Sequence, residues 1–203
     1  MPDNVTILFE DEALLVCVKP RGLLSAKDAS GKPSVTDFLP DGVYPVHRLD
    51  REAVGLMVFA KTAACAAFLS EAMGKTVQKE YLALCEGQPE ERGALTDLLY
   101  HDRVKNKTYV VRRKRGGVRE ARLSYEVLHG GETSLLHVLL HTGRTHQIRV
   151  QFASRGYPLC GDRKYGAKSG GALQLYAWRL TFPHPDGRKM SFELPPELLD
   201  FPL

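Results

Sequence analysis

The chain has 203 residues, with 28 Lys and Arg against 24 Asp and Glu, and a formal net charge of +4. This length allows one large domain or two small ones to bury a core without metals or disulfides, which excludes a small cross-linked scaffold. No apolar run approaches about 18 residues, and the first twelve residues show no export pattern, so we expect neither a membrane span nor a secretory signal.

Strands dominate the first half of the predicted elements. Two β-rich runs, 5–11 and 13–20, are expected to be neighbouring strands, because Pro20 and Gly22 end the second run with turn chemistry. A short helix is expected at 34–39 and a buried strand at 55–60. Thr62 then has the chemistry of an N-cap for a helix in the Ala-rich run at 63–75. A strand at 79–86 follows, apolar on both faces and therefore central.

The second half continues with strands around one predicted helix. Ala121, Leu123, Tyr125 and Val127 share one face of a strand, and another strand is expected at 134–141. A helix is predicted at 145–154, with Ile148 and Phe152 facing inward. Its first turns place three polar residues on the remaining surface: His146, Gln147 and Arg149.

The last two predicted strands, 172–182 and 189–194, are joined by the turn residues at 185–187. Short connections of this kind indicate an α+β fold. We expect a single catalytic domain over residues 1–203, with a large mixed, mostly antiparallel β-sheet flanked by helices and loops.

Positive charge is concentrated in two segments. Residues 101–122 hold nine Lys or Arg against two acidic residues, and residues 141–168 hold six against one, so the remainder of the chain is acidic. A polyanion partner is the natural inference, although two solvated basic faces would give the same counts. The four cysteines form no C-x-x-C pair, and three of them have apolar neighbours, which indicates core packing in a reducing cytoplasm.

Three positions carry candidate chemistry. Asp50 follows His47 and Arg48 and precedes a buried strand, where a carboxylate would be oriented; its alternative role is to cap a turn and pair with Arg48 or Arg51. Tyr81 is either a core residue whose hydroxyl reaches the surface or a ring that faces a base.

The third position is the turn and helix start at 141–149. Arg144, Thr145, His146 and Arg149 converge there, and the backbone N–H groups of a helix start attract phosphate. The alternative is a helix with exposed polar residues, which would not need so dense a cluster.

Several motifs together resemble the RluA-type family of RNA pseudouridine synthases. They are H-R-L-D with the following G-L-x-V-x-A-K (47–61), K-E-Y-L-A (79–83), H-T-G-R-T-H-Q-I-R-V (141–150) and G-x-P-L-x-G-D-x-x-Y-G (156–166), with V-K-P-R-G-L-L-S (18–25) similar to the family's N-terminal segment. The resemblance extends from about Phe9 to Leu194. It implies the pseudouridine synthase fold and a cofactor-independent, metal-free enzyme that isomerises a uridine in structured ribosomal or transfer RNA.

The resemblance also implies roles for individual residues. Asp50 matches the essential aspartate, which acts on the ribose anomeric carbon or removes a proton as uracil detaches. Tyr81 matches the tyrosine that stacks on uracil, and Arg149 the basic residue that pairs with the aspartate. Arg48 matches an arginine that enters the space of the flipped nucleotide. The RNA-binding residues that we expect are His47, Arg48, Lys79, Arg112, Arg113, Lys114, Arg115, Arg144, Thr145 and His146.

One departure from the family pattern lies next to this site. Many relatives have Thr-Ser where this chain has Ala53 and Val54. Either the hydroxyls mainly supported the loop and apolar packing replaces them, or this chain holds its aspartate loop differently. The chain is also expected to lack the small N-terminal RNA-binding domain of some relatives.

Two rival functions remain at the level of the sequence. A catalytically inactive RNA-binding or assembly factor would explain Ala53 and Val54, although Asp50, Tyr81 and Arg149 are intact. A metal-dependent phosphodiesterase could use His47, Asp50, His141 and His146, but the spacing of these residues is a weak metal signature.

Overall fold

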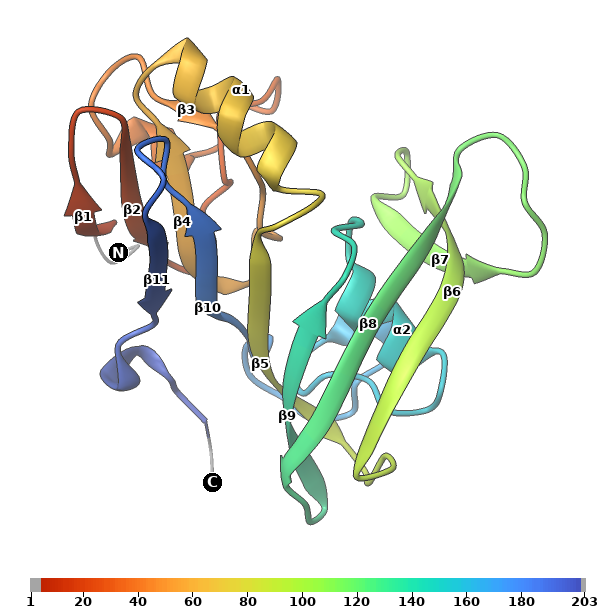
Figure 1. The fold of residues 1–203 in the computed structure, drawn as a ribbon. Coiled ribbons are helices and arrows are strands. Elements are labelled where there is room, and N and C mark those ends of the chain that lie inside the picture. Colours follow the sequence, from red (N-terminus) through yellow and green to blue (C-terminus); the bar gives the residue numbers. More distant parts are fainter. Residues whose placement is uncertain (1–4, 202–203) are drawn as a thin grey trace. The chain divides into compact units, whose positions relative to one another are not determined.

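The structure is a computed structural model that describes residues 5–201 of the chain. It divides into two compact units, one of residues 1–79 and 176–199 and the other of residues 80–175 and 200–203 (Figure 1). The expectation of one catalytic domain over 1–203 stays a prediction. Within the described part of the chain, neither α-helix is long and apolar enough to cross a membrane.

The first unit is built on a sheet in which four strands are neighbours. In spatial order they are β1 (Thr6–Glu10), β2 (Leu14–Lys19), β4 (Val54–Ala60) and β10 (Leu175–Pro183). The short β3 (Tyr44–Pro45) pairs with β4, and β11 (Lys189–Glu193) pairs with β10 through the expected hairpin. These pairs are antiparallel except β4 with β10, which run parallel with Tyr176 opposite Val54.

The core of the first unit lies around β2 and β4. All six residues of β2 and the last six of β4 are buried, as expected for strands covered on both faces. Helix α1 (Ala63–Ala72) packs against β3 and β4, and Thr62 caps it by accepting a 3.1 Å hydrogen bond from the backbone N–H of Cys65. The predicted helix at 63–75 is therefore confirmed but ends three residues earlier. The short helix expected at 34–39 is a 3₁₀ turn at Val35–Asp37.

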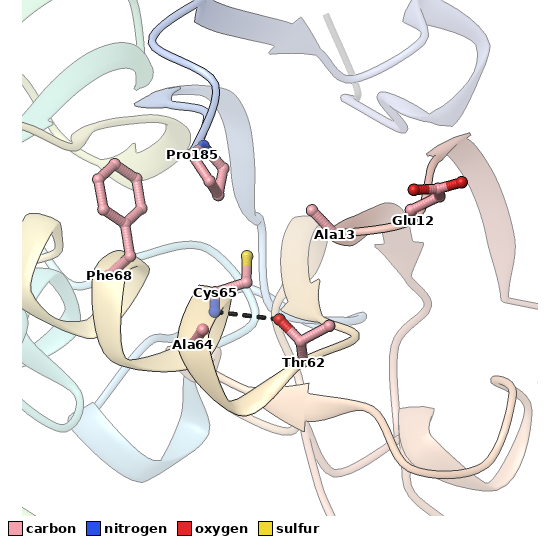
Figure 2. Close-up of a pocket in the computed structure, with 7 residues that line it drawn as sticks. All are labelled: Glu12, Ala13, Thr62, Ala64, Cys65, Phe68 and Pro185. Atoms are coloured by element: carbon pink, nitrogen blue, oxygen red, sulfur yellow. Dashed lines mark hydrogen bonds between the residues drawn. The ribbon is translucent and has the colours of Figure 1, made fainter.

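An apolar pocket opens beside the N-terminus of α1 (Figure 2). Its volume is about 340 Å³, and it is lined by Glu12, Ala13, Thr62, Ala64, Cys65, Phe68 and Pro185. Figure 2 shows the capping bond from Cys65 to Thr62 at its edge. None of the residues of the 47–52 segment lines this pocket.

The second unit is a sheet with one short helix. Its strands, in spatial order, are β5 (Gln78–Glu86), β9 (Thr133–Leu140), β8 (Val118–His129), β6 (Arg92–Asp102) and β7 (Lys107–Val111). The pairs β9–β8, β8–β6 and β6–β7 are antiparallel. Helix α2 (Gln147–Ala153) packs against β6 and β7, and 3₁₀ turns lie at Arg163–Tyr165 here and at Pro196–Leu198 in the first unit. The predicted strands at 79–86, around 121–127 and at 134–141 are confirmed.

The sequence pattern did not predict β6 and β7. In β6 only Leu95 and Leu99 are buried, four residues apart, so its apolar spacing does not alternate as in a half-buried strand. Strand β7 is short, and its Tyr109 and Val110 are exposed. These segments are strands because the backbone of β6 pairs with both β7 and β8. Pairing with a distant segment cannot be recognised from the residues of one strand alone.

The fold class is confirmed: the described residues form an α+β protein with mostly antiparallel strands, one parallel pair and two α-helices. The helix expected at 145–154 is shorter, Gln147–Ala153. His146 precedes it in the left-handed conformation with φ 55°, which a helix cannot continue.

Gly55 is required by the packing of β4 on β10. Its φ of +133° lies in a region that side chains avoid, and a Cβ there would lie 2.4 Å from the carbonyl oxygen of Ala177. The glycine therefore lets the two parallel strands approach next to the segment that carries Asp50.

Gly55→Ala is expected to lower the free energy of unfolding by more than about 2 kcal/mol, because backbone and not a flexible side chain obstructs the new methyl group. Urea unfolding measures the change. Gly74→Ala is the matched control, since Gly74 has open space around it and no positive φ. Equal unfolding midpoints for Gly55→Ala and the wild type would contradict the close packing.

Candidate active site

A hydrogen-bonded clamp holds the segment that contains Asp50. The hydroxyl of Ser25 donates to the carbonyl oxygen of Leu49 and accepts from the backbone N–H of the same residue, both at 2.9 Å. Ser25 and Leu49 are both buried, so these two bonds fix the residue that directly precedes Asp50 away from competing water.

The same N-terminal segment binds the residues that follow Asp50. The Gly22 N–H donates to the Arg51 carbonyl, and the Arg51 Nε donates back to the Gly22 carbonyl, each at 2.9 Å. Nη1 of Arg21 donates to the Glu52 carbonyl at 2.6 Å. Asp50 is thus flanked on both sides by residues tied to Lys19–Ser25, which is the segment quoted as V-K-P-R-G-L-L-S in the sequence.

Lys19 completes the clamp from within the core. Its side chain is fully buried, and its Nζ donates to the carbonyls of Pro20 and Arg51, each at 2.9 Å. Burial lowers the pKa of Lys19 to about 7, opposed by the negative charges of Glu52 and Asp50. The residue roles assigned from the sequence did not include Lys19, although it lies in a quoted motif.

Asp50 sits in a tight turn at the end of this segment. It is half-buried, and its carbonyl accepts from the backbone N–H of Ala53 at 3.1 Å. Arg51 Nε lies 3.7 Å from the carboxylate of Glu52, and the pairing of Asp50 with Arg48 or Arg51 considered from the sequence stays a hypothesis. The side chain of Ala53 is only 1% exposed. Apolar packing at position 53 together with the clamp favours the first explanation of the Ala53-Val54 departure.

His47 anchors the start of the loop as a neutral ring. Its Nε2 accepts from the backbone N–H of Val58 at 3.1 Å. Burial lowers the pKa of His47 to about 3, and the charge of Lys79 acts in the same direction. The ring is therefore uncharged at neutral pH with its proton on Nδ1. Because Nε2 is occupied, that nitrogen cannot also ligate a metal, which argues against the phosphodiesterase alternative. Arg48, one residue on, is exposed.

In the second unit, Tyr81 and Arg149 are both buried. Tyr81 lies on β5 and is 8% exposed. Arg149 donates from Nε and Nη2 to the two carboxylate oxygens of Asp162 at 2.7 and 2.8 Å, and both side chains are below 10% exposed. The expectation that His146, Gln147 and Arg149 lie on the helix surface is wrong, because all three are buried. A buried carboxylate, hydroxyl groups and backbone groups of the same unit satisfy their side chains.

A network around Tyr165 supports this arginine. The Arg149 guanidinium lies 5.1 Å from the centre of the Tyr165 ring. The Tyr165 hydroxyl accepts from the backbone N–H of Thr108 at 2.8 Å and lies 2.9 Å from Nδ1 of His146. Asp162 and Tyr165 are the D and Y of the quoted G-D-x-x-Y-G, so the sequence contained them but assigned them no role.

The side chain of Gln147 holds the turn before α2. Its Oε1 accepts from the Thr142 hydroxyl and the Arg144 N–H, while its Nε2 donates to the Arg122 carbonyl. Phosphate binding at this helix start stays a prediction. Arg144 and Thr145 are exposed, whereas His146 is buried.

The basic run expected to grip RNA lies in a hairpin connection. Arg112, Arg113, Lys114 and Arg115 join β7 to β8, and all four are exposed. The guanidinium of Arg115 lies 5.0 Å from the centre of the Tyr100 ring. This segment therefore offers four cations to solvent with little competing acidic charge.

The sequence profile of a family described as RNA pseudouridylate synthase matches residues 13–154. This match covers both the Asp50 loop and Arg149. The chain belongs to this family. The resemblance to RluA-type enzymes drawn from the motifs is thereby confirmed at the level of the family.

Individual relatives within the pseudouridine synthases agree. The chain is 36% identical to an uncharacterized RNA pseudouridine synthase of Aquifex aeolicus, over 95% of this chain and 70% of that protein. It is 34% identical to ribosomal large subunit pseudouridine synthase D of Nitrosomonas europaea, over 93% of this chain and 61% of that protein. It thus spans between three fifths and three quarters of these relatives.

A solved structure shares the fold. Human RNA pseudouridylate synthase domain containing 4 aligns with a TM-score of 0.77 and 25% identity, over 95% of this chain and 90% of that chain. The residues Lys19, Asp162 and Tyr165 each contact a segment that carries an expected site residue. Lys19 hydrogen-bonds to the residue after Asp50, and Asp162 and Tyr165 contact Arg149.

The buried amine of Lys19 predicts a pH-dependent stability. The unfolded pKa of lysine is about 10.4, above the folded value, so between pH 7 and 10 the unfolded chain binds a proton that the folded chain lacks. The free energy of unfolding of the wild type relative to Lys19→Met should therefore rise with pH, by about 1 kcal/mol per pH unit between pH 8 and 9.5.

Denaturant unfolding across this pH range measures the slope. Lys75→Met is the control, because Lys75 is an exposed partner of Glu71 and its substitution should leave the slope unchanged. Parallel pH profiles for the wild type and Lys19→Met would show that the Lys19 amine keeps its ordinary proton affinity in the folded chain.

Proposed function

We propose that this chain isomerises a specific uridine to pseudouridine in structured ribosomal or transfer RNA, with Asp50 acting on a flipped-out uridine. The single observation that carries the proposal is the clamp from Lys19–Ser25 onto Leu49–Glu52. It orients one half-buried carboxylate through hydrogen bonds on both sides of it in sequence, which are buried at Leu49 and partly buried or exposed at Arg51 and Glu52. Family membership supplies the reaction class.

The reaction requires no external redox partner. The bond between N1 of uracil and C1′ of ribose breaks, the base turns, and a bond forms between C5 and C1′. The proton on C5 is then lost and N1 gains one, so atoms and electrons balance within the nucleotide and solvent. Asp50 serves either as the nucleophile at C1′ or as the base that removes a proton while uracil detaches.

Tyr81 and Arg149 are assigned the roles that the family resemblance implies. A uridine must leave its stack before it reacts, at a cost of about a few kcal/mol, and an aromatic ring offers it a new stacking surface. The two bonds from Arg149 to Asp162 fix the plane of the guanidinium, so Asp162 is a positioning residue for it. Arg48, exposed beside the clamp, is assigned to the RNA strand around the target.

Asp50→Asn is expected to abolish pseudouridine formation, by at least about a thousandfold, because an amide is neither a carboxylate nucleophile nor a base. Total RNA from cells that lack the gene is treated with each purified variant, and pseudouridine is then mapped. The wild type should convert a discrete uridine. Asp41→Asn, at an exposed aspartate in the turn before β3, should behave as the wild type.

Persistent modification by Asp50→Asn would remove Asp50 from the reaction. RNA binding by the wild type without a product on any RNA would instead favour the inactive binding factor, and this is the outcome that separates the two functions.

Replacement of Arg112, Arg113, Lys114 and Arg115 by Ala should weaken RNA binding and flatten its salt dependence. Each lost phosphate contact reduces the slope of log K against log salt by about 0.7 to 0.9. The dissociation constant is measured over a series of KCl concentrations. The control replaces Arg188 and Lys189, two exposed basic residues in the β10–β11 hairpin. An unchanged slope would show that the 112–115 run does not touch phosphate.

A further inference from the structure

A second cavity in the first unit lies directly beside the Asp50 loop. Its volume is about 340 Å³, within the range of about 300 to 1,000 Å³ typical of small-ligand sites. Two short segments form it, 26–28 and 45–48. The first follows Ser25 of the clamp, and the second ends two residues before Asp50, so the hydrogen bonds that hold Asp50 also hold the walls of this cavity.

The walls of the cavity combine apolar surface with both signs of charge. Ala26, Pro45 and Val46 supply apolar atoms, and Lys27 and Arg48 supply cations. Lys27 is 3.0 Å from Asp37, but its side chain is 72% exposed, so this pair leaves its charge available to solvent. Among the described residues, Arg48 makes no hydrogen bond or ion pair.

Asp28 and His47 add an acceptor and a donor. Hydrogen bonds from the hydroxyl and backbone N–H of Ser30 lower the pKa of Asp28, which stays ionised at neutral pH. The neutral His47 ring uses Nε2 for Val58, so its remaining nitrogen carries a proton. The walls of this cavity therefore carry a carboxylate acceptor and two cations beside the neutral ring of His47.

We propose that this cavity binds the nucleotide adjoining the target uridine, with its base against Ala26, Pro45 and Val46 and its phosphate near Lys27 and Arg48. The inference rests on the proposed function and adds a specificity site to it. Arg48 and Asp50 are two residues apart, at most about 7 Å along the chain, which matches the step to the next nucleotide of a splayed-out strand.

The carboxylate of Asp28 offers an acceptor to the edge of the bound base. Adenine, cytosine and guanine can donate an exocyclic amino group to it, and uracil can donate its ring N–H.

The test uses a synthetic RNA stem-loop that carries the uridine found by mapping, and variants of it with an abasic site at each neighbouring position in turn. For the wild type, one abasic position should lower kcat/KM by about ten- to a hundredfold, the usual effect of a lost base contact. Ala26→Phe fills the cavity, so it should lose a similar factor on the intact RNA and nothing more on that abasic RNA.

Two further variants sharpen the result. Ala64→Phe puts the same side chain into the apolar pocket of Figure 2 and should match the wild type on every RNA. Asp28→Asn removes the charge of this acceptor, so it should lower kcat/KM on the intact RNA and lower it less on the abasic RNA.

The outcomes separate this inference from the proposed function. If the wild type is active but indifferent to every neighbouring base, or if Ala26→Phe is as active as Ala64→Phe, the nucleotide pocket is overturned and the isomerase proposal stands. Absence of pseudouridine from every RNA treated with the wild type would overturn the proposed function, and this inference with it.

Discussion

The position of the Asp50 loop depends on hydrogen bonds between side chains and backbone groups that tie it to residues 19–25. Ser25 hydrogen-bonds to Leu49, the residue before Asp50. Gly22 and Lys19 hydrogen-bond to Arg51, the residue after it. Strands β2 and β4 are antiparallel neighbours, with Lys19 opposite Gly55, which brings the two ends of this clamp together. Gly55 in turn admits β10 at close range. The loop of Asp50, the carboxylate proposed to react, is therefore anchored next to the buried strands β2 and β4.

Each unit buries ionisable side chains that fix the position of a neighbouring group more than they stabilise the fold. A buried lysine and a buried arginine–carboxylate pair each lose solvation, and such pairs are often no more stable than apolar residues of the same size. Burial lowers the pKa of Lys19, and two short hydrogen bonds to Asp162 compensate the buried charge of Arg149. These interactions orient a loop and a guanidinium plane, which isolated apolar contacts would do less sharply.

The exposed charges have a different purpose. The run at 112–115 is carried by a hairpin connection whose own sheet contacts lie at its base, so its cations are free to follow a phosphate backbone. Arg48 and Lys27 lie at a small concave site instead. Under the proposals made above, long-range attraction to RNA and recognition of a single nucleotide belong to different residues, as expected where phosphate contacts supply affinity and base contacts supply specificity.

Much of the secondary structure followed from the sequence alone. The runs that became β2, β4 and β5, the Thr62 cap and the hairpin into β11 follow from local patterns of burial and turn chemistry, and the ordered motifs determined the family. Only the tertiary structure decided that β6 and β7 are strands, that Arg149 lies buried against Asp162, and that Lys19 reaches Arg51. These features join residues 13 to 32 positions apart or arise from strand pairing, and neither periodicity nor composition records which distant partner a polar group will meet.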